Sequence, residues 1–250
     1  MFGPVEKYLL ERIDVERSIH ITLIDPEKVT PTQASRIGEN SRNSGTSAIM
    51  IGGSTFVSQT HLDSVVKAVK HAVKIPTILF PNNITGISRH ADAIWFMSLL
   101  NSVDPYFLIG AQILGAPLVK KYRLEPIPMG YVIVGEGGTA GIVGKAIPVP
   151  YSKPELAAAH ALAAQYLGMH FIYLEGGSGA KEPVPPEMIS IVKHYIDIPL
   201  IVGGGIKTKP QALAAASAGA DVIVTGNIIE TSDAKRKVSE IIEGIRGTRS

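Results

Sequence analysis

The sequence contains no cysteine. Disulfides, thiolate metal sites, iron–sulfur clusters and cysteine nucleophiles are therefore excluded from the chemistry of this chain. A chain without cysteine also fits the reducing conditions of the cytoplasm, which is where we expect this protein to work.

An excess of charge of one sign is also missing. The 24 Lys and Arg residues almost balance the 22 Asp and Glu residues, so the formal net charge is only +2. Basic residues are scattered, apart from the trio at 235–237, whereas nucleic-acid binders usually show a clustered basic face. No nucleic-acid partner is expected.

Long hydrophobic runs are absent as well. Charges are spread through residues 1–18, so no signal peptide is expected there. The nearest approach to a membrane span is 104–121, but prolines and glycines interrupt it, and a span needs about 20 apolar residues. The sequence predicts no membrane anchor.

Short β-branched runs are present in regular order, and helical patterns fill most of the gaps between them. The runs are continuous rather than alternating, which is typical of parallel strands buried on both faces. They occupy residues 18–25, 47–53, 76–80, 93–100, 126–135, 170–177, 199–205 and 221–227. This pattern predicts one domain, 1–250, folded as a (β/α)8 TIM barrel; a doubly wound open sheet is the alternative.

One repeat is irregular. Only residues 81–92 separate the third run from the fourth, and they hold a proline, a glycine and two adjacent asparagines. Such a segment is too short and too broken for a covering helix. The third helix is expected to be missing or reduced to a single turn, which leaves an apolar flank and suggests a homo-oligomer.

Glycines follow the last two strands. Gly203, Gly204 and Gly205 end the run at 199–205, and Gly226 with Asn227 ends the run at 221–227. In a barrel, these two strand ends and the helix starts beside them usually form a phosphate site. We expect the backbone at both places to approach a phosphate closely.

A carboxylate ends the sixth strand. Glu175 is followed by Gly176, Gly177, Ser178 and Gly179, which can supply backbone N–H groups and a hydroxyl. Because barrel enzymes carry their catalytic groups at the carboxyl ends of the strands, Glu175 is expected to act in chemistry.

Oxygen ligands end the first two strands. Asp25 is the last residue of the run at 18–25, and Ser54 follows the run at 47–53. A carboxylate and a hydroxyl without histidine or cysteine suit Mg²⁺, which usually bridges to substrate phosphates. A turn-forming Asp25 and a helix-capping Ser54 are the alternatives. With Glu175 between two anion sites, the layout suits a reaction joining a phosphorylated alcohol to a diphosphate-activated partner.

The motifs "LIDPEK", "IGGST", "YLEGGSG", "VGGGIKT" and "VTGN", in this order at strand ends, resemble the geranylgeranylglyceryl phosphate synthases. These archaeal ether-lipid prenyltransferases are related to the bacterial heptaprenylglyceryl phosphate synthases. The resemblance runs from about Ser18 to Asn227, although Gly176 stands where the family commonly has alanine. The family's barrel also lacks its third helix.

The resemblance implies substrates and roles. sn-Glycerol 1-phosphate would be held by Tyr173, Leu174, Glu175, Gly176, Gly177, Ser178, Gly179, Gly204, Gly205, Gly226 and Asn227. Asp25 and Ser54 would hold Mg²⁺ on the diphosphate of a prenyl diphosphate, geranylgeranyl by resemblance. Glu175 would take the proton of the attacking hydroxyl, and Tyr173 would add a hydrogen bond to the glycerol.

The prenyl chain needs an apolar groove, for which residues 93–100 and 105–119 are candidates. The length of that chain cannot be read from the sequence. Because the substrate is a lipid, transient contact with a membrane is expected. The sequence assigns no role to Trp95, Lys207 or Arg89.

Two other functions compete. A barrel sugar-phosphate isomerase would share the phosphate site but commonly needs a carboxylate on the fifth strand, and 126–135 holds none. A phosphate-ligand binding protein without activity would leave Glu175 between two anion sites unexplained.

Overall fold

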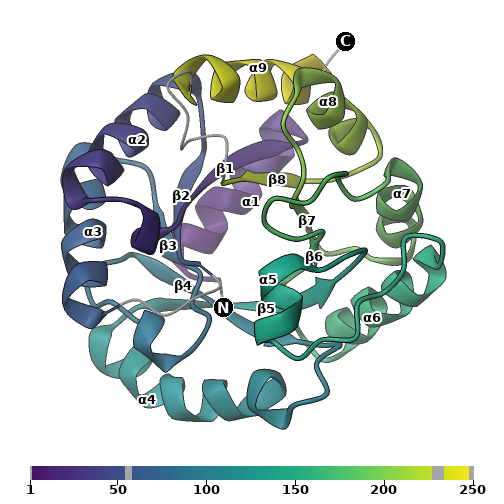
Figure 1. Cartoon of the computed structure of the whole chain (residues 1–250), viewed down its shortest axis with the longest axis horizontal. Coiled ribbons are helices and arrows are strands. Elements are labelled where there is room, and N and C mark those ends of the chain that lie inside the picture. The colour runs from purple at the N-terminus through teal and green to yellow at the C-terminus, as the bar shows by residue number, and fades with distance from the viewer. Residues whose placement is uncertain (1, 54–57, 227–233, 248–250) are drawn as a thin grey trace.

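The computed structural model describes residues 2–53, 58–226 and 234–247. Eight parallel strands close into a barrel in the order in which they occur along the chain (Figure 1). They are β1 (Ile19–Ile24), β2 (Ala48–Ile51), β3 (Thr77–Leu79), β4 (Ala93–Leu99), β5 (Glu125–Ile133), β6 (Phe171–Glu175), β7 (Leu200–Gly203) and β8 (Val222–Thr225). The closed (β/α)8 barrel confirms the predicted fold, and each strand lies within or next to an expected run.

Helices surround the barrel (Figure 1). They are α2 (Pro31–Ser44), α3 (Gln59–Ala72), α4 (Ala111–Tyr122), α6 (Pro154–Tyr166), α7 (Pro186–Tyr195), α8 (Lys209–Ser217) and α9 (Ala234–Arg246). Local sequence fixes several of their ends: Thr30 and Thr208 form capping boxes with Gln33 and Gln211. A π-helical turn, Tyr106–Gly110, precedes α4.

The third covering helix is missing, as the sequence predicted. Between β3 and β4 the chain forms only the 3-10 turn η2 (Ile84–Gly86), which Asn83 caps by accepting a hydrogen bond from the Thr85 N–H. Without a helix on this flank, the space beside η2 stays open for part of the binding cavity described below.

Two helices were not predicted. The first, α1 (Pro4–Glu16), is rich in charge, and it lies across one end of the barrel, where Val5 and Leu9 join the interior cluster. The second, α5 (Gly138–Val143), is a short helix in the connection after β5. Neither carries a long apolar stripe that sequence periodicity could reveal.

Apolar side chains fill both faces of the sheet. Inside the barrel, residues such as Trp95, Met129 and Phe171 form one cluster, and alternate residues such as Ile172 and Leu174 pack outwards under the helices. This double burial explains the continuous apolar runs of the sequence. Among the described residues, no helix is both long enough and apolar enough to span a bilayer.

Candidate active site

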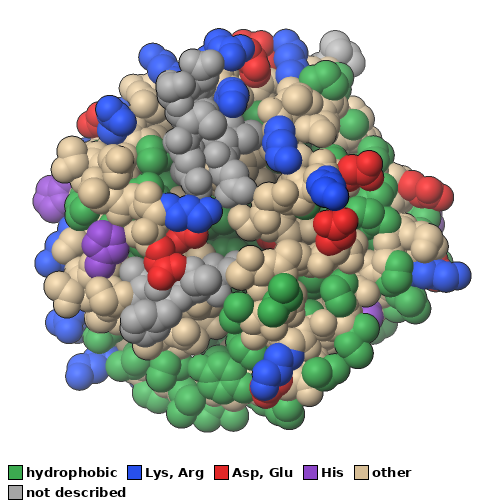
Figure 2. Space-filling view, viewed as in Figure 1, with side chains coloured by type: hydrophobic (Ala, Val, Ile, Leu, Met, Phe, Trp, Pro, Cys, Tyr) green, Lys and Arg blue, Asp and Glu red, His purple; other side chains and the backbone are tan. Residues whose placement is uncertain are grey.

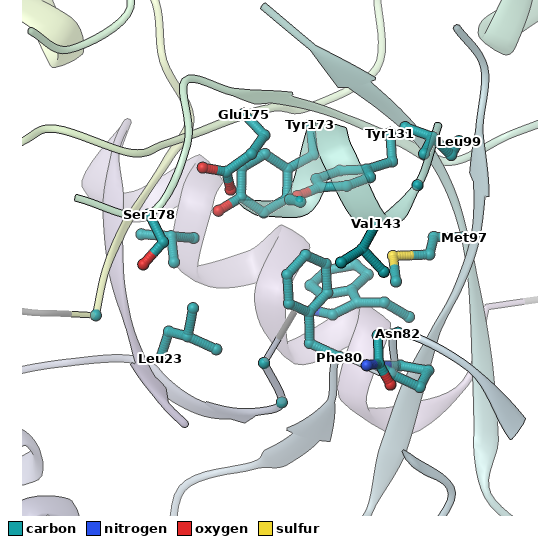
Figure 3. Close-up of a pocket in the computed structure, with 18 of the residues that line it drawn as sticks. Leu23, Phe80, Asn82, Met97, Leu99, Tyr131, Val143, Tyr173, Glu175 and Ser178 are labelled. Atoms are coloured by element: carbon teal, nitrogen blue, oxygen red, sulfur yellow. The ribbon is translucent and has the colours of Figure 1, made fainter. Parts of the chain in front are cut away.

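A cavity with a volume of about 190 Å³ opens at the carboxyl ends of the strands. Its wall includes residues that follow β1, β2, β6, β7 and β8, and it continues towards η2 and α4. In Figure 3, Glu175, Tyr173 and Tyr131 lie together on one side of this cavity, with Phe80, Asn82 and Met97 on another.

Glu175 is the buried carboxylate of the cavity, with 6% of its surface exposed. Its Oε1 accepts a hydrogen bond of 2.7 Å from the backbone N–H of Gly177, and the hydroxyls of Tyr173 and Tyr131 also donate to it. Burial raises the pKa of Glu175 above its ordinary value, while these three donors act in the opposite direction. The result is a carboxylate that is held in one orientation and is a stronger base than an exposed glutamate.

Three aromatic rings support Glu175. Tyr131 and Tyr173 are register partners on β5 and β6, their ring centroids are 5.2 Å apart, and Phe80 packs against both. Gly203 lies opposite Glu175 in the register, and a Cβ there would come within 2.0 Å of the Tyr173 hydroxyl. Gly203 is therefore required so that the Tyr173 hydroxyl can reach Glu175.

The loop after β7 depends on left-handed glycines. Gly204 and Gly205 have φ of +87° and +75°, which side chains disfavour. A Cβ on Gly204 would also lie 2.8 Å from Glu175 Oε1, and one on Gly205 would lie 2.6 Å from the Glu182 carbonyl oxygen. The conformation and packing of the loop therefore require these glycines, whether or not a phosphate binds beside them.

Gly226 differs from them. Gly226 is not among the glycines with a positive φ. A Cβ there would make only an ordinary contact of 3.5 Å with Leu23. Packing against the described residues therefore does not require glycine at 226. Because Gly226 lines the cavity, the missing side chain leaves room for a ligand.

Asp25, directly after β1, also lines the cavity. Its Oδ1 caps the turn that follows β1 by accepting a hydrogen bond of 3.1 Å from the Glu27 N–H, and Lys28 Nζ lies 3.9 Å from its Oδ2. A Cβ on Gly53 would come within 2.6 Å of Oδ1, so glycine makes room for this carboxylate. Asp25 is thus a turn former, the alternative considered from the sequence, and also a cavity carboxylate.

The donor set at Asp25 fits Mg²⁺. Among the residues that the structure describes, no cluster of three or more carboxylate, histidine or cysteine side chains could hold a metal ion. A single wall carboxylate is nevertheless what Mg²⁺ uses when substrate phosphates and water complete its shell.

The cavity extends into an apolar groove on the flank without a helix. Ile84 and Ile87 line it from the η2 segment, and Phe107, Ala111 and Gly115 line it from the π-turn and α4. A Cβ on Gly115 would approach Ile87 Cδ1 to 3.2 Å, so glycine at 115 keeps the groove wide. The predicted prenyl groove thus coincides with the apolar arm of the cavity.

The residues predicted for the site fall into three groups. Lining the cavity are Asp25, Tyr173, Glu175, Ser178, Gly179, Gly204, Gly205 and Gly226. Leu174, Gly176 and Gly177 do not line it, and the Leu174 side chain packs outwards beneath the helices, so it cannot reach a ligand there. Ser54 and Asn227 lie outside the described residues.

Tyr131 was missed from the sequence. An isomerase commonly has a carboxylate on this strand, but the residues around Tyr131 are apolar. The importance of Tyr131 depends on the β5–β6 register, which places it beside Tyr173. Alternation along "GYVIVG" puts Tyr131 on the interior face, which is the only signal that could have identified it.

The three residues without an assigned role now have positions. Trp95 is buried inside the barrel, where its Nε1–H points to Met50 Sδ, and it also contributes to the cavity wall. Lys207 lines the cavity and donates from Nζ to the Ala180 carbonyl. Arg89 stacks on the Tyr122 ring and does not line the cavity.

Comparison with known proteins identifies close relatives. The PcrB family matches residues 11–245. Geranylgeranylglyceryl phosphate synthase of Thermofilum pendens is 54% identical over 249 residues, covering 100% of this chain and 96% of the relative. The Pyrococcus abyssi protein of the same name is 55% identical and covers 98% of each chain.

A solved structure also matches over nearly the whole chain. The (S)-3-O-geranylgeranylglyceryl phosphate synthase of Thermoplasma acidophilum, crystallised with its substrate sn-glycerol-1-phosphate, superposes with a TM-score of 0.94 at 39% identity. The match covers 99% of this chain and 100% of that one.

Proposed function

The chain belongs to the PcrB family, and we propose that it joins sn-glycerol 1-phosphate to geranylgeranyl diphosphate, the reaction for which its relatives are named. The 3-hydroxyl of the glycerol attacks C1 of the prenyl chain, the C1–O bond to diphosphate breaks, and an ether and free diphosphate result. One observation carries the proposal: a buried carboxylate, Glu175, lies in a cavity that has a glycine-built loop at one end and an apolar groove at the other.

The glycerol phosphate binds against the ends of β6, β7 and β8. Gly204, Gly205 and Gly226 bring backbone to the cavity without obstructing side chains, and Ser178 and Gly179 contribute a hydroxyl and further backbone. Backbone N–H groups at helix starts favour phosphate. A solved relative with sn-glycerol-1-phosphate as its substrate supports this choice of ligand. Asn227 remains part of the proposed phosphate-binding segment. Gly176 and Gly177 do not, because they do not line the cavity and their N–H groups donate to the Gly203 carbonyl and to Glu175 Oε1.

Glu175 acts as the general base. Its raised pKa makes it a better proton acceptor than an exposed glutamate, and the Gly177 N–H fixes one of its oxygens. It takes the proton of the 3-hydroxyl as the new C–O bond forms, and its negative charge stabilises allylic cation character at C1. Tyr173 orients both the carboxylate and the glycerol.

Mg²⁺ is the proposed metal, held by Asp25 and Ser54 together with the substrate diphosphate. A metal ion bound there would supply positive charge to the departing diphosphate. Lys28, which also lines the cavity near Asp25, adds positive charge at the same end.

We propose that the protein is a homo-oligomer. Large apolar side chains are exposed on and around α4 and α5, which follow the flank that lacks a helix. They include Val103, Ile109, Ile113, Leu114, Ile142 and Ile147. Figure 2 shows hydrophobic side chains gathered along the lower edge of the molecule, over α4. Apolar patches of this kind usually mark contact surfaces.

The test is turnover of radiolabelled sn-glycerol 1-phosphate with geranylgeranyl diphosphate and Mg²⁺, measured as lipid-soluble label. Glu175→Gln should reduce kcat by about 10²–10⁴, the usual contribution of a general base, and EDTA should stop turnover. The matched control is Glu182→Gln, a neighbouring loop carboxylate that does not line the cavity. Incorporation only with a longer prenyl donor would revise the chain length, and no incorporation with any prenyl diphosphate would overturn the proposal.

A further inference from the structure

A buried histidine lies behind the phosphate-binding end of the barrel. His20, on β1, is only 2% exposed. Its neighbours Ile19 and Ile21 belong to the cluster inside the barrel, so His20 faces outwards, between the sheet and the helices. The catalytic step described above makes no use of it.

Both ring nitrogens of His20 have hydroxyl partners. Nδ1 lies 2.8 Å from Thr46 Oγ1, and Nε2 lies 2.9 Å from Thr225 Oγ1. Thr46 also donates to the His20 carbonyl oxygen and accepts from Thr22. Because the single hydroxyl hydrogen of Thr46 is given to the His20 carbonyl, the neutral imidazole donates from Nδ1–H to Thr46 and accepts at Nε2 from the Thr225 hydroxyl.

The network lies in a dry and uncharged environment. Thr22, Thr46 and Thr225 are all buried. Desolvation alone lowers the pKa of His20 to about 3, so the ring is neutral in the physiological range. The neutral ring of His20 therefore connects Thr46 to Thr225 through two hydrogen bonds. This connection is rigid, because leaving either hydroxyl unpaired in this buried environment would cost free energy.

The connector ends at the cavity. Thr225 is the last residue of β8, it pairs with Thr22 of β1 in the strand register, and it lines the cavity. The next residue is Gly226, whose bare backbone is proposed to approach the phosphate. The position of the Thr225 side chain therefore controls where the Gly226 backbone lies.

We propose that His20 is a positioning residue for the phosphate of sn-glycerol 1-phosphate, acting through Thr225 on the backbone of Gly226. The inference rests on the proposed function, since it takes that phosphate as the ligand at Gly226. His20 does not touch the substrate; it fixes the end of β8 from the outer face of the sheet, with Thr46 fixing His20 in turn.

The test compares Thr225→Val with Thr225→Ser. Valine keeps the shape of threonine and removes the hydroxyl, whereas serine keeps the hydroxyl. Thr225→Val should raise KM for sn-glycerol 1-phosphate about fivefold, the size of one lost hydrogen bond, while KM for geranylgeranyl diphosphate stays unchanged. Thr225→Ser should restore most of the affinity. His20→Gln, whose amide can reach towards Thr225, should be milder than His20→Leu in the same measurement.

A purely structural role gives a different result. In that case Thr225→Val and His20→Leu would lower the melting temperature, but the two KM values would keep their wild-type ratio, and the inference would be wrong. Calorimetric titration of sn-glycerol 1-phosphate into the wild-type protein distinguishes a failure of the proposed function from a failure of the role of His20. If the wild type neither binds it nor turns it over, the proposed function fails; if it does both and the variants leave the ratio unchanged, only the role of His20 fails.

Discussion

Glu175 is buried beside two tyrosine hydroxyls, and these two features act on its pKa in opposite directions. Burial raises the pKa and dominates, while hydrogen bonds from Gly177, Tyr173 and Tyr131 limit the rise. Burial also raises the pKa of both tyrosines well above the ordinary value, so their hydroxyls remain protonated donors. The site thus keeps a carboxylate that is both basic and correctly oriented.

Removal of one donor should be visible in the pH profile. In Tyr131→Phe the ionised form of Glu175 loses a hydrogen bond, so its pKa rises further. We expect the acidic limb of the kcat profile to move to higher pH, with activity at pH 6 reduced more than at pH 8. Tyr151→Phe is the control: the charge of Glu175 raises the pKa of Tyr151, but Tyr151 is not among the groups that hydrogen-bond to Glu175. An identical shift in both variants would contradict the role of Tyr131.

The same carboxylate should cost stability at neutral pH. Because the pKa of Glu175 is raised from 4.5 on folding, the folded state binds more protons than the unfolded state between these two pKa values. Stability therefore falls as pH rises through that window, by up to about 1.4 kcal/mol per pH unit. Glu175→Gln lacks this dependence, so its free energy of unfolding should exceed that of the wild type increasingly above pH 4.5. Urea unfolding at several pH values measures the difference, and parallel curves would contradict it.

At the scale of elements, the missing third helix has a function. The turn η2 occupies the place of a helix, and the space that remains is continuous with the cavity between Ile87 and Gly115. Small residues on α4 widen this space on one side. A complete helix would fill the volume in which we propose that the prenyl chain binds.

A side chain at 115 should block this groove. Gly115→Leu places additional atoms between α4 and Ile87, so KM for geranylgeranyl diphosphate should rise about tenfold or more, while KM for sn-glycerol 1-phosphate is unchanged. A shorter donor, such as geranyl diphosphate, should be affected least. Ala116→Leu is the matched control, because residue 116 is exposed on the same helix. Equal effects of the two substitutions would argue against the groove.

One distant side chain caps the start of α1. Glu125, at the start of β5, accepts hydrogen bonds of 2.8 Å from the backbone N–H groups of Val5 and Glu6. It therefore acts as the cap of α1 from a residue 119 to 120 positions away, which no local pattern could reveal.

Glu125→Ala should destabilise the protein by about 1 kcal/mol, the usual effect of removing a cap. Glu11→Ala, on the exposed side of α1, should have little effect. Turnover at ambient temperature should be unchanged in both, because α1 does not line the cavity. Denaturant unfolding gives the stability difference, and equal losses in the two variants would contradict the capping role.

At the scale of the whole molecule, the proposed homo-oligomer would bury the exposed apolar side chains of the α4 and α5 region. Light scattering on a sizing column should show a dimer or larger species for the wild type. Ile113→Glu combined with Ile142→Glu should shift it to the monomer, because burying either charge in an interface is unfavourable. Leu167→Glu, at an exposed leucine beside Tyr166 at the end of α6, should leave the mass unchanged. A monomeric wild type would contradict the proposed assembly.

The sequence by itself determined the barrel, the missing third helix and the strand ends that line the cavity, because each of these has a local cause. Continuous apolar runs predict buried parallel strands, and "PNNITGISRHAD" cannot form a helix. Residues directly after parallel strands must gather at one end of the barrel, which is why Asp25, Glu175 and Gly226 could be placed together.

Only the tertiary structure decided the remaining features, because they depend on contacts between distant residues. The pairing of Tyr131 with Tyr173 follows from strand register, the cap on α1 comes from Glu125, and the connection from His20 to Thr225 spans 205 positions. The glycines show the same division. Sequence marked Gly203, Gly204, Gly205 and Gly226 alike, but packing requires the first three, whereas at Gly226 the described residues leave space for a ligand.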